Sequence, residues 1–267
     1  MQEKETKYAL ITGGSMGIGK AIAIELAQKS TPLLLVALEE PMLYQTADEL
    51  RQTYQIPVET LGINLVDEQS PQRVFDWCQE NNYAVNILIN NAGFGRGGQM
   101  HAFQLSEYYA MMALNNRATV GLTYLFIPEL ERHDEAYILI MSSMEAMLPL
   151  PYKAVYAGTK NFLFGYALAL REELSGKNIG VTVMCPGPTV TNESGLKRIQ
   201  ANPSNKILVK MPDEVARAGV NGMFQRKNIV VPGRLQSTFF SLGKHLPTRL
   251  KMRLLKRISQ SFANDPG

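Results

Sequence analysis

The stretch YALITGGSMGIG, residues 8–19, decides how the rest of the chain is interpreted. Its first five residues predict a buried β-strand, and a glycine-rich loop follows before a helical pattern begins. In this loop Gly13 can form a tight turn, Gly17 lets a pyrophosphate approach the backbone, and Gly19 lets the helix pack closely. The free N–H groups of the helix N-terminus would bind anionic oxygens. A plain glycine-rich turn is the alternative, but the position between the first strand and the first helix favours a nucleotide site.

Short apolar runs alternate with longer helical patterns along the rest of the chain. The runs are mostly continuous, which is typical of strands covered on both faces. Strand–helix alternation implies a parallel sheet with right-handed crossovers. We therefore predict an α/β fold, a single doubly wound domain over residues 1–267 with a seven-stranded parallel sheet and helices on both faces. The predicted strands are 8–12, 32–37, 58–63, 86–90, 137–142, 181–185 and 228–232, and the predicted helices are 17–29, 41–54, 70–82, 104–132, 152–176 and 212–225.

The charge of the chain is small but unevenly distributed. A net charge of +3 over 267 residues gives no indication of nucleic-acid binding, whereas the segment from Arg234 onwards has seven lysine and arginine residues and one acidic residue. Residues 234–262 are predicted to form a basic, amphipathic helical extension with apolar residues at helical spacing. Its apolar stripe could pack on the protein itself, on a second subunit, or on an anionic membrane surface. We expect the protein or its homo-oligomer to cover it.

The cysteines and the N-terminus favour a reducing compartment. Cys78 and Cys185 have no metal-ligand spacing and are interpreted as buried free thiols. The three histidines have no cysteine or carboxylate at ligand spacing, so we predict no metal site. The N-terminal sequence lacks the layout of a signal peptide. No apolar run reaches the roughly 18 residues of a membrane-spanning helix. We expect a cytoplasmic protein.

A tyrosine and a lysine stand four residues apart in VYAGTKNFLF, residues 155–164. On a helix this spacing places Tyr156 and Lys160 on one face, one turn apart. A cation at that distance favours phenolate and would lower the phenol pKa from its usual value of about 10. The pair is common on helices without any function. It suggests an acid/base pair here because a nucleotide loop precedes it in the chain.

Several motifs occur in an order that resembles the short-chain dehydrogenases/reductases. They are TGGSMGIG, NNAG (90–93), Asn115, Ser143, the Tyr156/Lys160 spacing and PGPTVT (186–191). The resemblance covers about residues 7–232, and residues 234–257 resemble the ending of the DltE-like branch. It implies a Rossmann fold. It also implies an oxidoreductase that transfers a hydride between NAD(P)(H) and an alcohol or carbonyl group of a small molecule, with carbonyl reduction the expected direction.

The resemblance also implies roles for individual residues. Tyr156 would be the general acid/base, Ser143 would donate a hydrogen bond to the substrate oxygen, Lys160 would bind the cofactor ribose, and Asn115 would hold a water that links Lys160 to solvent. The expected cofactor-binding residues, besides Tyr156 and Lys160, are Gly13, Ser15, Met16, Gly17, Ile18, Gly19, Leu38, Asn64, Leu65, Asn91, Ala92, Gly93, Pro186, Gly187, Thr189 and Thr191.

The choice between NAD and NADP stays open in the sequence. The second strand ends VALEE, with Ala37 and Leu38 where an acidic residue for NAD or an arginine for NADP would be expected. The resemblance to the DltE-like branch gives a weak preference for NADP. A non-catalytic nucleotide-binding sensor or scaffold is the alternative function. The intact Ser143, Tyr156 and Lys160 set argues against it, because a sensor needs no proton donor.

Overall fold

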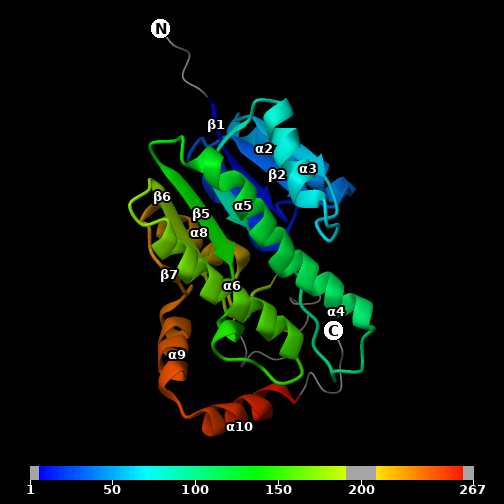
Figure 1. The fold of residues 1–267 in the computed structure, drawn as a ribbon, viewed down its shortest axis with the longest axis vertical. Helices are drawn as coiled ribbons and strands as arrows, with labels where there is room; N and C mark the ends of the chain where they lie inside the picture. The colour runs from blue at the N-terminus through cyan, green and yellow to red at the C-terminus, as the bar shows by residue number, and fades with distance from the viewer. Residues whose placement is uncertain (1–5, 191–208, 261–267) are drawn as a thin grey trace.

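The computed structural model describes residues 6–190 and 209–260, and Figure 1 shows their arrangement. Seven parallel strands form one sheet in the order β3-β2-β1-β4-β5-β6-β7. The predicted doubly wound parallel sheet is therefore confirmed. Its strands are β1 (Lys7–Thr12), β2 (Leu33–Ala37), β3 (Val58–Gly62), β4 (Ala84–Asn90), β5 (Ala136–Met141), β6 (Ile179–Met184) and β7 (Ile229–Val230).

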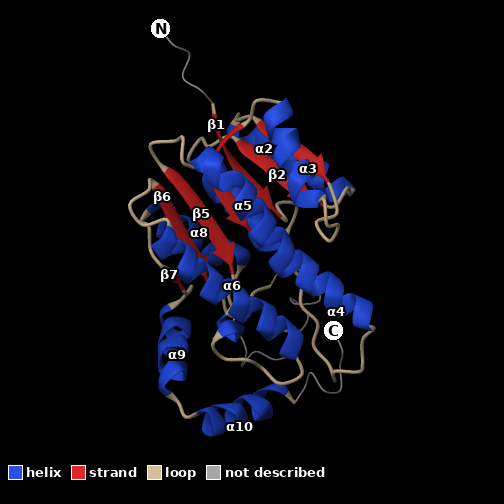
Figure 2. Cartoon of the chain, in the orientation of Figure 1, coloured by secondary structure: helices blue, strands red, loops and turns tan. Residues whose placement is uncertain are grey.

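Helices cover both faces of the sheet (Figure 2). One face packs against α1 (Gly17–Ala27), α2 (Pro41–Tyr54) and α8 (Pro212–Phe224). The other packs against α3 (Ser70–Glu80), α5 (Thr119–Leu130) and α6 (Ala154–Glu173). Alternate strand residues serve the two faces, because side chains in a strand point to opposite sides. Leu10 and Leu34 lie in the core beneath α5, whereas Ile11 and Leu35 lie in the core beneath α1, and all four are fully buried.

The strand order changes direction between β1 and β4. From β1 the chain adds β2 and β3 on one side, and then it crosses to β4 and continues to β7 on the other. In open parallel sheets, ligands bind at the carboxyl ends of the strands beside such a switch point. The loop at 12–19 follows β1 and the NNAG motif closes β4, so both predicted cofactor segments meet at this crevice.

The segment predicted as one helix over 104–132 is divided in the structure. It begins as α4 (Leu105–Met112), continues through a π-helical turn η1 (Ala113–Ala118), and ends as α5. A π-turn inserts one residue into the helix and is frequently found at functional sites. Asn115 lies in this turn and is fully buried.

Two helices follow the sheet and lie beyond the carboxyl ends of the strands (Figure 1). They are α9 (Arg234–His245) and α10 (Thr248–Ser259). One face of α10 packs on the protein, with Leu255 and Ser259 buried and the Lys251 Nζ donating a hydrogen bond to the Met147 carbonyl at 3.4 Å. No helix among the described residues has the length and apolar character needed to cross a bilayer.

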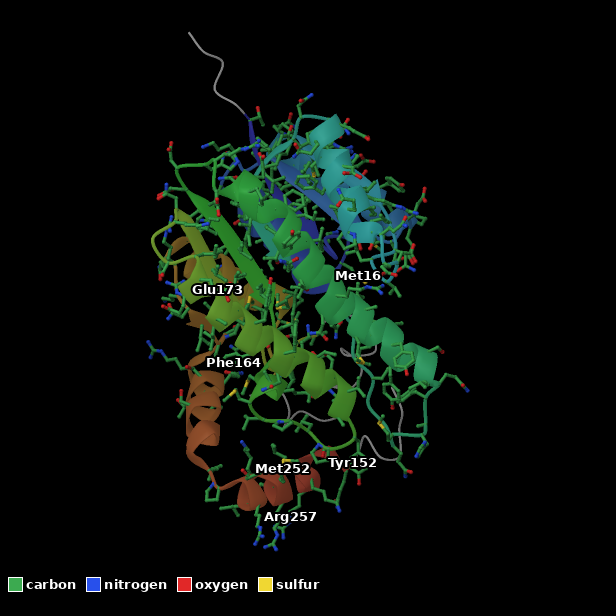
Figure 3. All side chains as sticks on the ribbon, in the orientation of Figure 1. Met16, Tyr152, Phe164, Glu173, Met252 and Arg257 are labelled. Carbon is green, nitrogen blue, oxygen red and sulfur yellow. The ribbon has the colours of Figure 1, made fainter. Side chains whose placement is uncertain are left out.

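The apolar stripe of α10 divides between two environments. Met252 lies on the side of α10 that faces the body of the molecule, whereas Arg257 points away from it (Figure 3). Leu250 and Leu254 on α10 are 48% and 43% exposed, and Leu246, the C-cap residue of α9, is 37% exposed, although the sequence analysis expected these leucines to be covered.

Candidate active site

The glycine-rich loop is fixed to the end of β4 by Thr12 and Asn91. The Asn91 Nδ2 donates to the carbonyls of Thr12 at 2.9 Å and Gly13 at 3.2 Å. The Thr12 hydroxyl accepts from the backbone N–H groups of Asn91 and Ala92, both at 3.0 Å. The loop is therefore held by short contacts between β1 and β4 at the switch point. Asn90 stabilises the same strand end from below, where its amide donates to the buried Thr123 hydroxyl at 3.0 Å.

Two positions in the loop require glycine, Gly19 because a side chain would clash and Gly13 because of its backbone conformation. A Cβ on Gly19 would lie 1.9 Å from the Gly13 carbonyl oxygen and 2.6 Å from the Asn91 amide nitrogen. Gly13 has φ +66°, which L side chains rarely adopt. The sequence analysis expected Gly19 to serve packing of helix on strand. The closest contact is instead with the loop itself, so Gly19 sets the distance between α1 and the backbone that a ligand would approach.

The remaining predicted cofactor residues line this edge in different ways. Met16 and Leu38 are each 51% exposed, and Ile18 is half-buried. Leu65 is buried, so only its backbone could face a ligand, and the Asn64 Oδ1 accepts from the Val66 N–H at 3.0 Å. The other positions contribute backbone or hydroxyl groups nearby: the Ser15 carbonyl accepts from the Thr46 hydroxyl, the Pro186 carbonyl from the Met144 N–H, and the Gly187 carbonyl from the Thr189 hydroxyl. Thr191 lies outside the described residues.

Asn115 holds the backbone that follows NNAG. Its Oδ1 accepts from the Phe94 N–H and its Nδ2 donates to the Phe94 carbonyl, both at 3.0 Å. The second N–H of the amide is donated to the Thr159 hydroxyl at 3.0 Å. A Cβ on Gly93 would lie 2.8 Å from the Asn115 Oδ1 and 3.3 Å from the Lys160 Nζ. Both amide N–H groups of Asn115 are thus used within the protein, and a water bound by its side chain would have to donate to Oδ1.

Lys160 is almost fully buried beneath the site. Its Nζ donates to the Met141 carbonyl at 2.9 Å, at the end of β5, and its own carbonyl accepts from the Ser142 hydroxyl at 2.7 Å. Burial lowers the pKa of Lys160 to about 8, against the opposing effects of Cys185 and Glu145. Its Nζ lies 5.8 Å from the centroid of the Tyr156 ring. The structure thus brings the predicted lysine and tyrosine together on one face of α6.

The Ser143 side chain lies close enough to the Tyr156 hydroxyl to influence its pKa. Burial, and secondarily the Glu145 carboxylate, raise the pKa of Tyr156 above its usual value of 10, while Ser143 opposes them. The sequence argument considered only Lys160, whereas burial and the Glu145 carboxylate raise the pKa of Tyr156 in this structure. Both causes lie in the tertiary arrangement, which helical spacing does not reveal.

A second lysine and a carboxylate beside Tyr156 were missed by the sequence analysis. The Lys153 Nζ lies 3.0 Å from the Glu145 Oε1 and 5.6 Å from the centroid of the Tyr156 ring. Glu145 belongs to the 3-10 turn η2 (Met144–Ala146), which directly follows β5. The one signal in the sequence is that Glu145 stands two residues after Ser143. An open pocket of about 480 Å³ adjoins this end of α6 and is lined by Arg96, Gly98, Gln99, Met100, Tyr108, Tyr152, Lys153, Ala154 and Val155.

Comparison with known proteins gives a consistent result. A family model described as short chain dehydrogenase matches residues 7–201. The chain is similar to a very-long-chain 3-oxoacyl-CoA reductase from Kluyveromyces lactis, with 29% identity over 226 residues, which are 82% of this chain and 64% of that protein. It is also similar to sulfoacetaldehyde reductase 2 from Chromohalobacter salexigens, with 32% identity over 184 residues, 68% of this chain and 72% of that protein.

Solved structures show the same fold. A structure from work on 7beta-hydroxysteroid dehydrogenase stereoselectivity superposes with a TM-score of 0.86 at 20% identity, over 95% of this chain and 98% of that one. A short-chain dehydrogenase from Sphingobium yanoikuyae in complex with NADPH gives a TM-score of 0.76 at 25% identity, over 91% and 96% of the two chains.

Proposed function

Because the chain belongs to the short-chain dehydrogenase family, we propose that it is an NAD(P)-dependent oxidoreductase that reduces a carbonyl group of a small molecule. The observation that carries the proposal is the arrangement of three side chains at the sheet's carboxyl edge. The Ser143 side chain lies beside the Tyr156 hydroxyl, and the Lys160 Nζ lies 5.8 Å from the centroid of the Tyr156 ring. The chain spans 64% of the length of the Kluyveromyces relative, so the activity is proposed from this chain's own residues.

The loop after β1 fits the pyrophosphate of a dinucleotide. Gly13 and Gly17 have positive φ angles of 66° and 57°, and no side chain among the described residues caps the N-terminus of α1. The N–H groups of that first turn are therefore available to anionic oxygens, and the helix dipole favours negative charge there. When bound, the nicotinamide would supply the hydride, and Lys160 and Tyr156 would lie beside it.

Proton transfer is the task of the protein in this reaction. Tyr156 has a phenol hydroxyl, which is protonated at neutral pH, and it can donate its proton to the carbonyl oxygen as that oxygen becomes negative. Ser143 is placed to hydrogen-bond the same oxygen, and such a donor is most effective when it is already in position. The buried ammonium of Lys160 would stabilise the phenolate that remains. Asn115 keeps the backbone at Gly93 and Phe94 in place against this group.

For the cofactor we propose NADP or NAD, with a weak preference for NADP. Leu38 follows β2 with 51% of its surface exposed and offers no charge to either ribose substituent. Glu39 packs over Gly62, where an added Cβ would lie 2.7 Å from the Glu39 Cβ. Support for NADP comes from the Sphingobium protein, which was solved with NADPH.

Cofactor consumption tests the proposed function directly. The purified protein is mixed with NADPH or NADH and a panel of aldehydes and ketones, including a 3-oxoacyl thioester and a sulfonated aldehyde of the kinds named for the two relatives. We expect carbonyl-dependent loss of the reduced cofactor's absorbance. Tight cofactor binding with no consumption by any carbonyl would instead favour the nucleotide-binding sensor.

The chain's organisation and partners are also proposals. We propose one domain over residues 1–267, with 234–262 as a C-terminal extension. The homo-oligomer stays a prediction, as does the cytoplasmic location, which the two free, buried cysteines support.

For the outer face of α10 we propose an anionic membrane surface as the partner. Exposed arginines flank the exposed leucines along the helix, at Arg249, Arg253 and Arg257. A two-fold contact would place this patch against its own copy, and the arginines would then repel one another. Anionic lipid complements both the charge and the leucines.

A further inference from the structure

We propose that the pocket beside Tyr156 selects carbonyl substrates that carry an anionic group, and that Arg96 binds this group. The inference deepens the proposed function and rests on the reduction of a carbonyl at Tyr156. It names the chemical class of the substrate, which is a small carbonyl compound with a carboxylate, or a group of similar charge, on the part of the molecule that does not react.

The pocket lies directly beside the reacting phenol. It has a volume of about 480 Å³ and is formed by the loop after β4 and the start of α6. The Gly98 N–H donates to the Tyr152 carbonyl at 2.8 Å, which ties this loop to the segment that enters α6. Gly95 packs against the Tyr156 ring, where an added Cβ would lie 2.7 Å from the ring carbon Cδ2. Arg96 follows Gly95 in the chain, so the cationic wall of the pocket begins next to the phenol.

Both charged side chains among the described residues that line the pocket are cations. They are Arg96 and Lys153, and the other lining side chains in this part of the chain are uncharged. Glu107 pairs with Arg96 at 3.4 Å and Glu145 pairs with Lys153 at 3.0 Å. Neither carboxylate belongs to the described lining of the pocket. An anion that enters would therefore meet a guanidinium and an ammonium group on this wall and no carboxylate.

Arg96 is better placed than Lys153 to exchange its partner for a ligand. Its contact with Glu107 uses only the Nη2 nitrogen, at a distance longer than that of a strong charge-assisted hydrogen bond. The two side chains are 41% and 37% exposed, and ion pairs of such exposure contribute little to stability. The guanidinium carbon lies 5.8 Å from the centroid of the Phe103 ring, and a guanidinium presents several N–H donors in a planar fork that matches a carboxylate. A substrate anion can therefore replace Glu107 at small cost.

The start of α6 favours the same charge. Ala154 and Val155, with which the helix begins, line the pocket. The first N–H groups of a helix have no acceptor within it, and its N-terminus carries a partial positive charge. No acidic residue stands in this first turn, and the side chain of the N-cap residue, Lys153, makes no capping hydrogen bond within the described chain. The helix therefore adds to the preference that the two cationic side chains give.

The remaining lining fits the carbon part of such a substrate. Met100, Ala154 and Val155 are apolar, and the Tyr108 hydroxyl is already used, because it donates to the Met100 carbonyl at 3.0 Å. A carbon chain or ring can lie against these residues while its anionic group is bound at Arg96. Binding at a point away from the carbonyl fixes the orientation of the reacting group, and this raises the rate of the chemical step.

Two aldehydes that differ only in charge test the inference. The full-length protein, with the reduced cofactor that it consumes, is given para-carboxybenzaldehyde or its uncharged methyl ester, methyl para-formylbenzoate. We expect kcat/KM to be roughly tenfold higher for the carboxylate than for the ester. Arg96→Gln should remove most of this preference by raising KM for the carboxylate, and the values for the ester should stay unchanged. A parent protein that reduces both aldehydes equally well, or prefers the ester, overturns the inference.

Control variants and salt separate charge from structure. Arg96→Lys keeps the charge and should retain part of the preference. Arg132→Gln removes an exposed arginine that pairs with Glu129 and should leave the preference unchanged. High salt should reduce the preference in the parent, because ions screen exposed charges, and should have little effect on Arg96→Gln. If Arg96→Gln lowered kcat/KM equally for both aldehydes, Arg96 would have a structural role and the inference would be wrong.

A binding measurement separates the inference from the proposed function. The corresponding alcohols, para-(hydroxymethyl)benzoate and its methyl ester, are titrated into the protein by calorimetry, with and without the oxidised cofactor. If neither aldehyde is reduced, the proposed function fails, while tighter binding of the carboxylate by the parent than by Arg96→Gln would still support the anion site. Equal affinities for the two alcohols in the parent, or binding of neither, overturn the inference.

Discussion

The cofactor side and the substrate side of the site are held by different kinds of contact. On the cofactor side, the loop after β1 is fixed by hydrogen bonds between the side chains of Thr12 and Asn91 and the backbone, and Gly19 leaves no room there for a Cβ. On the substrate side, the Tyr156 ring has the lysines Lys153 and Lys160 near it, with Lys153 and Glu145 paired at 3.0 Å. The first arrangement depends on shape and the second on charge, so changes of volume should damage one and changes of pH or charge the other.

Gly19→Ala should have the largest effect on cofactor binding and on stability. The new Cβ would lie 1.9 Å from the Gly13 carbonyl oxygen, so the loop or α1 must move. We expect the free energy of unfolding to fall by about 1–3 kcal/mol. Cofactor affinity measured by fluorescence titration should fall roughly tenfold or more. Gly165→Ala is the matched control, because a Cβ there meets nothing within 4 Å; it should stabilise α6 by about 0.5–1 kcal/mol. Unchanged cofactor affinity in Gly19→Ala would show that the loop does not bind the cofactor.

Lys160→Met should reduce both turnover and cofactor binding, and it should change how the free energy of unfolding depends on pH. We expect turnover to fall by about a hundredfold or more, with weaker cofactor binding. Burial holds the pKa of Lys160 at about 8 in the folded state, against its usual value of 10.5. The charged lysine therefore costs stability in full below pH 8, and the cost disappears as the pH rises to 10.5. Relative to Lys160→Met, the parent should gain up to about 1.4 kcal/mol per pH unit in that window.

Chemical denaturation at several pH values measures this difference. Lys177→Met, on the surface, should keep turnover. If the parent and Lys160→Met gained or lost stability in parallel from pH 8 to pH 10.5, Lys160 would not be a buried cation in the folded protein.

Leu38→Arg should change cofactor preference by a moderate amount. An arginine at this exposed position, just after β2, can pair with a 2′-phosphate, so the ratio of NADPH to NADH affinity should rise roughly tenfold, about 1.4 kcal/mol. Tyr124→Arg adds the same charge at a 75% exposed site on α5 and should leave the ratio unchanged. A parent protein that already prefers one cofactor a hundredfold, about 2.7 kcal/mol, would show that another residue recognises the 2′ position.

Leu254→Asp should have the smallest effect on folding. Leu254 is 43% exposed, so the free energy of unfolding should change by no more than about 0.5 kcal/mol. Sedimentation with anionic vesicles should be lost, while neutral vesicles serve as the lipid control. Its neighbour Leu255 is buried, and Leu255→Ala should cost about 2 kcal/mol or more. If Leu254→Asp instead lowered the melting temperature or broke an oligomer, a second subunit covers α10 and the lipid proposal fails.

The sequence predicted the elements of the fold well because each leaves a local pattern. Predicted strand 8–12 is β1, Lys7–Thr12, and predicted helix 41–54 is α2 with the same bounds. The order of strands in the sheet leaves no local pattern, because it depends on which edges pair. Predicted strand 228–232 shortens to β7, Ile229–Val230, because only two residues pair with β6.

In the candidate site, too, some features could be predicted from the sequence and others could not. Spacing alone placed Tyr156 and Lys160 on one face of a helix, and the structure has them there. Spacing could not predict that the pKa of Tyr156 is raised, since the causes are burial and Glu145, which belongs to η2 and not to α6. Glycine motifs are visible in a sequence because they meet a backbone requirement, whereas a charge acquires its effect only from the tertiary arrangement.

The most direct test of the central claim, that Tyr156 is the proton donor of a carbonyl reductase, is the turnover of Tyr156→Phe. The change removes one hydroxyl and keeps the ring that packs against Gly95. With a carbonyl that the parent accepts, we expect turnover to fall by about a hundredfold or more. The melting temperature and the cofactor affinity should stay at the parent's values, and Tyr166→Phe, on the same helix, should keep its turnover. A Tyr156→Phe variant that retained most of the parent's activity would contradict the account.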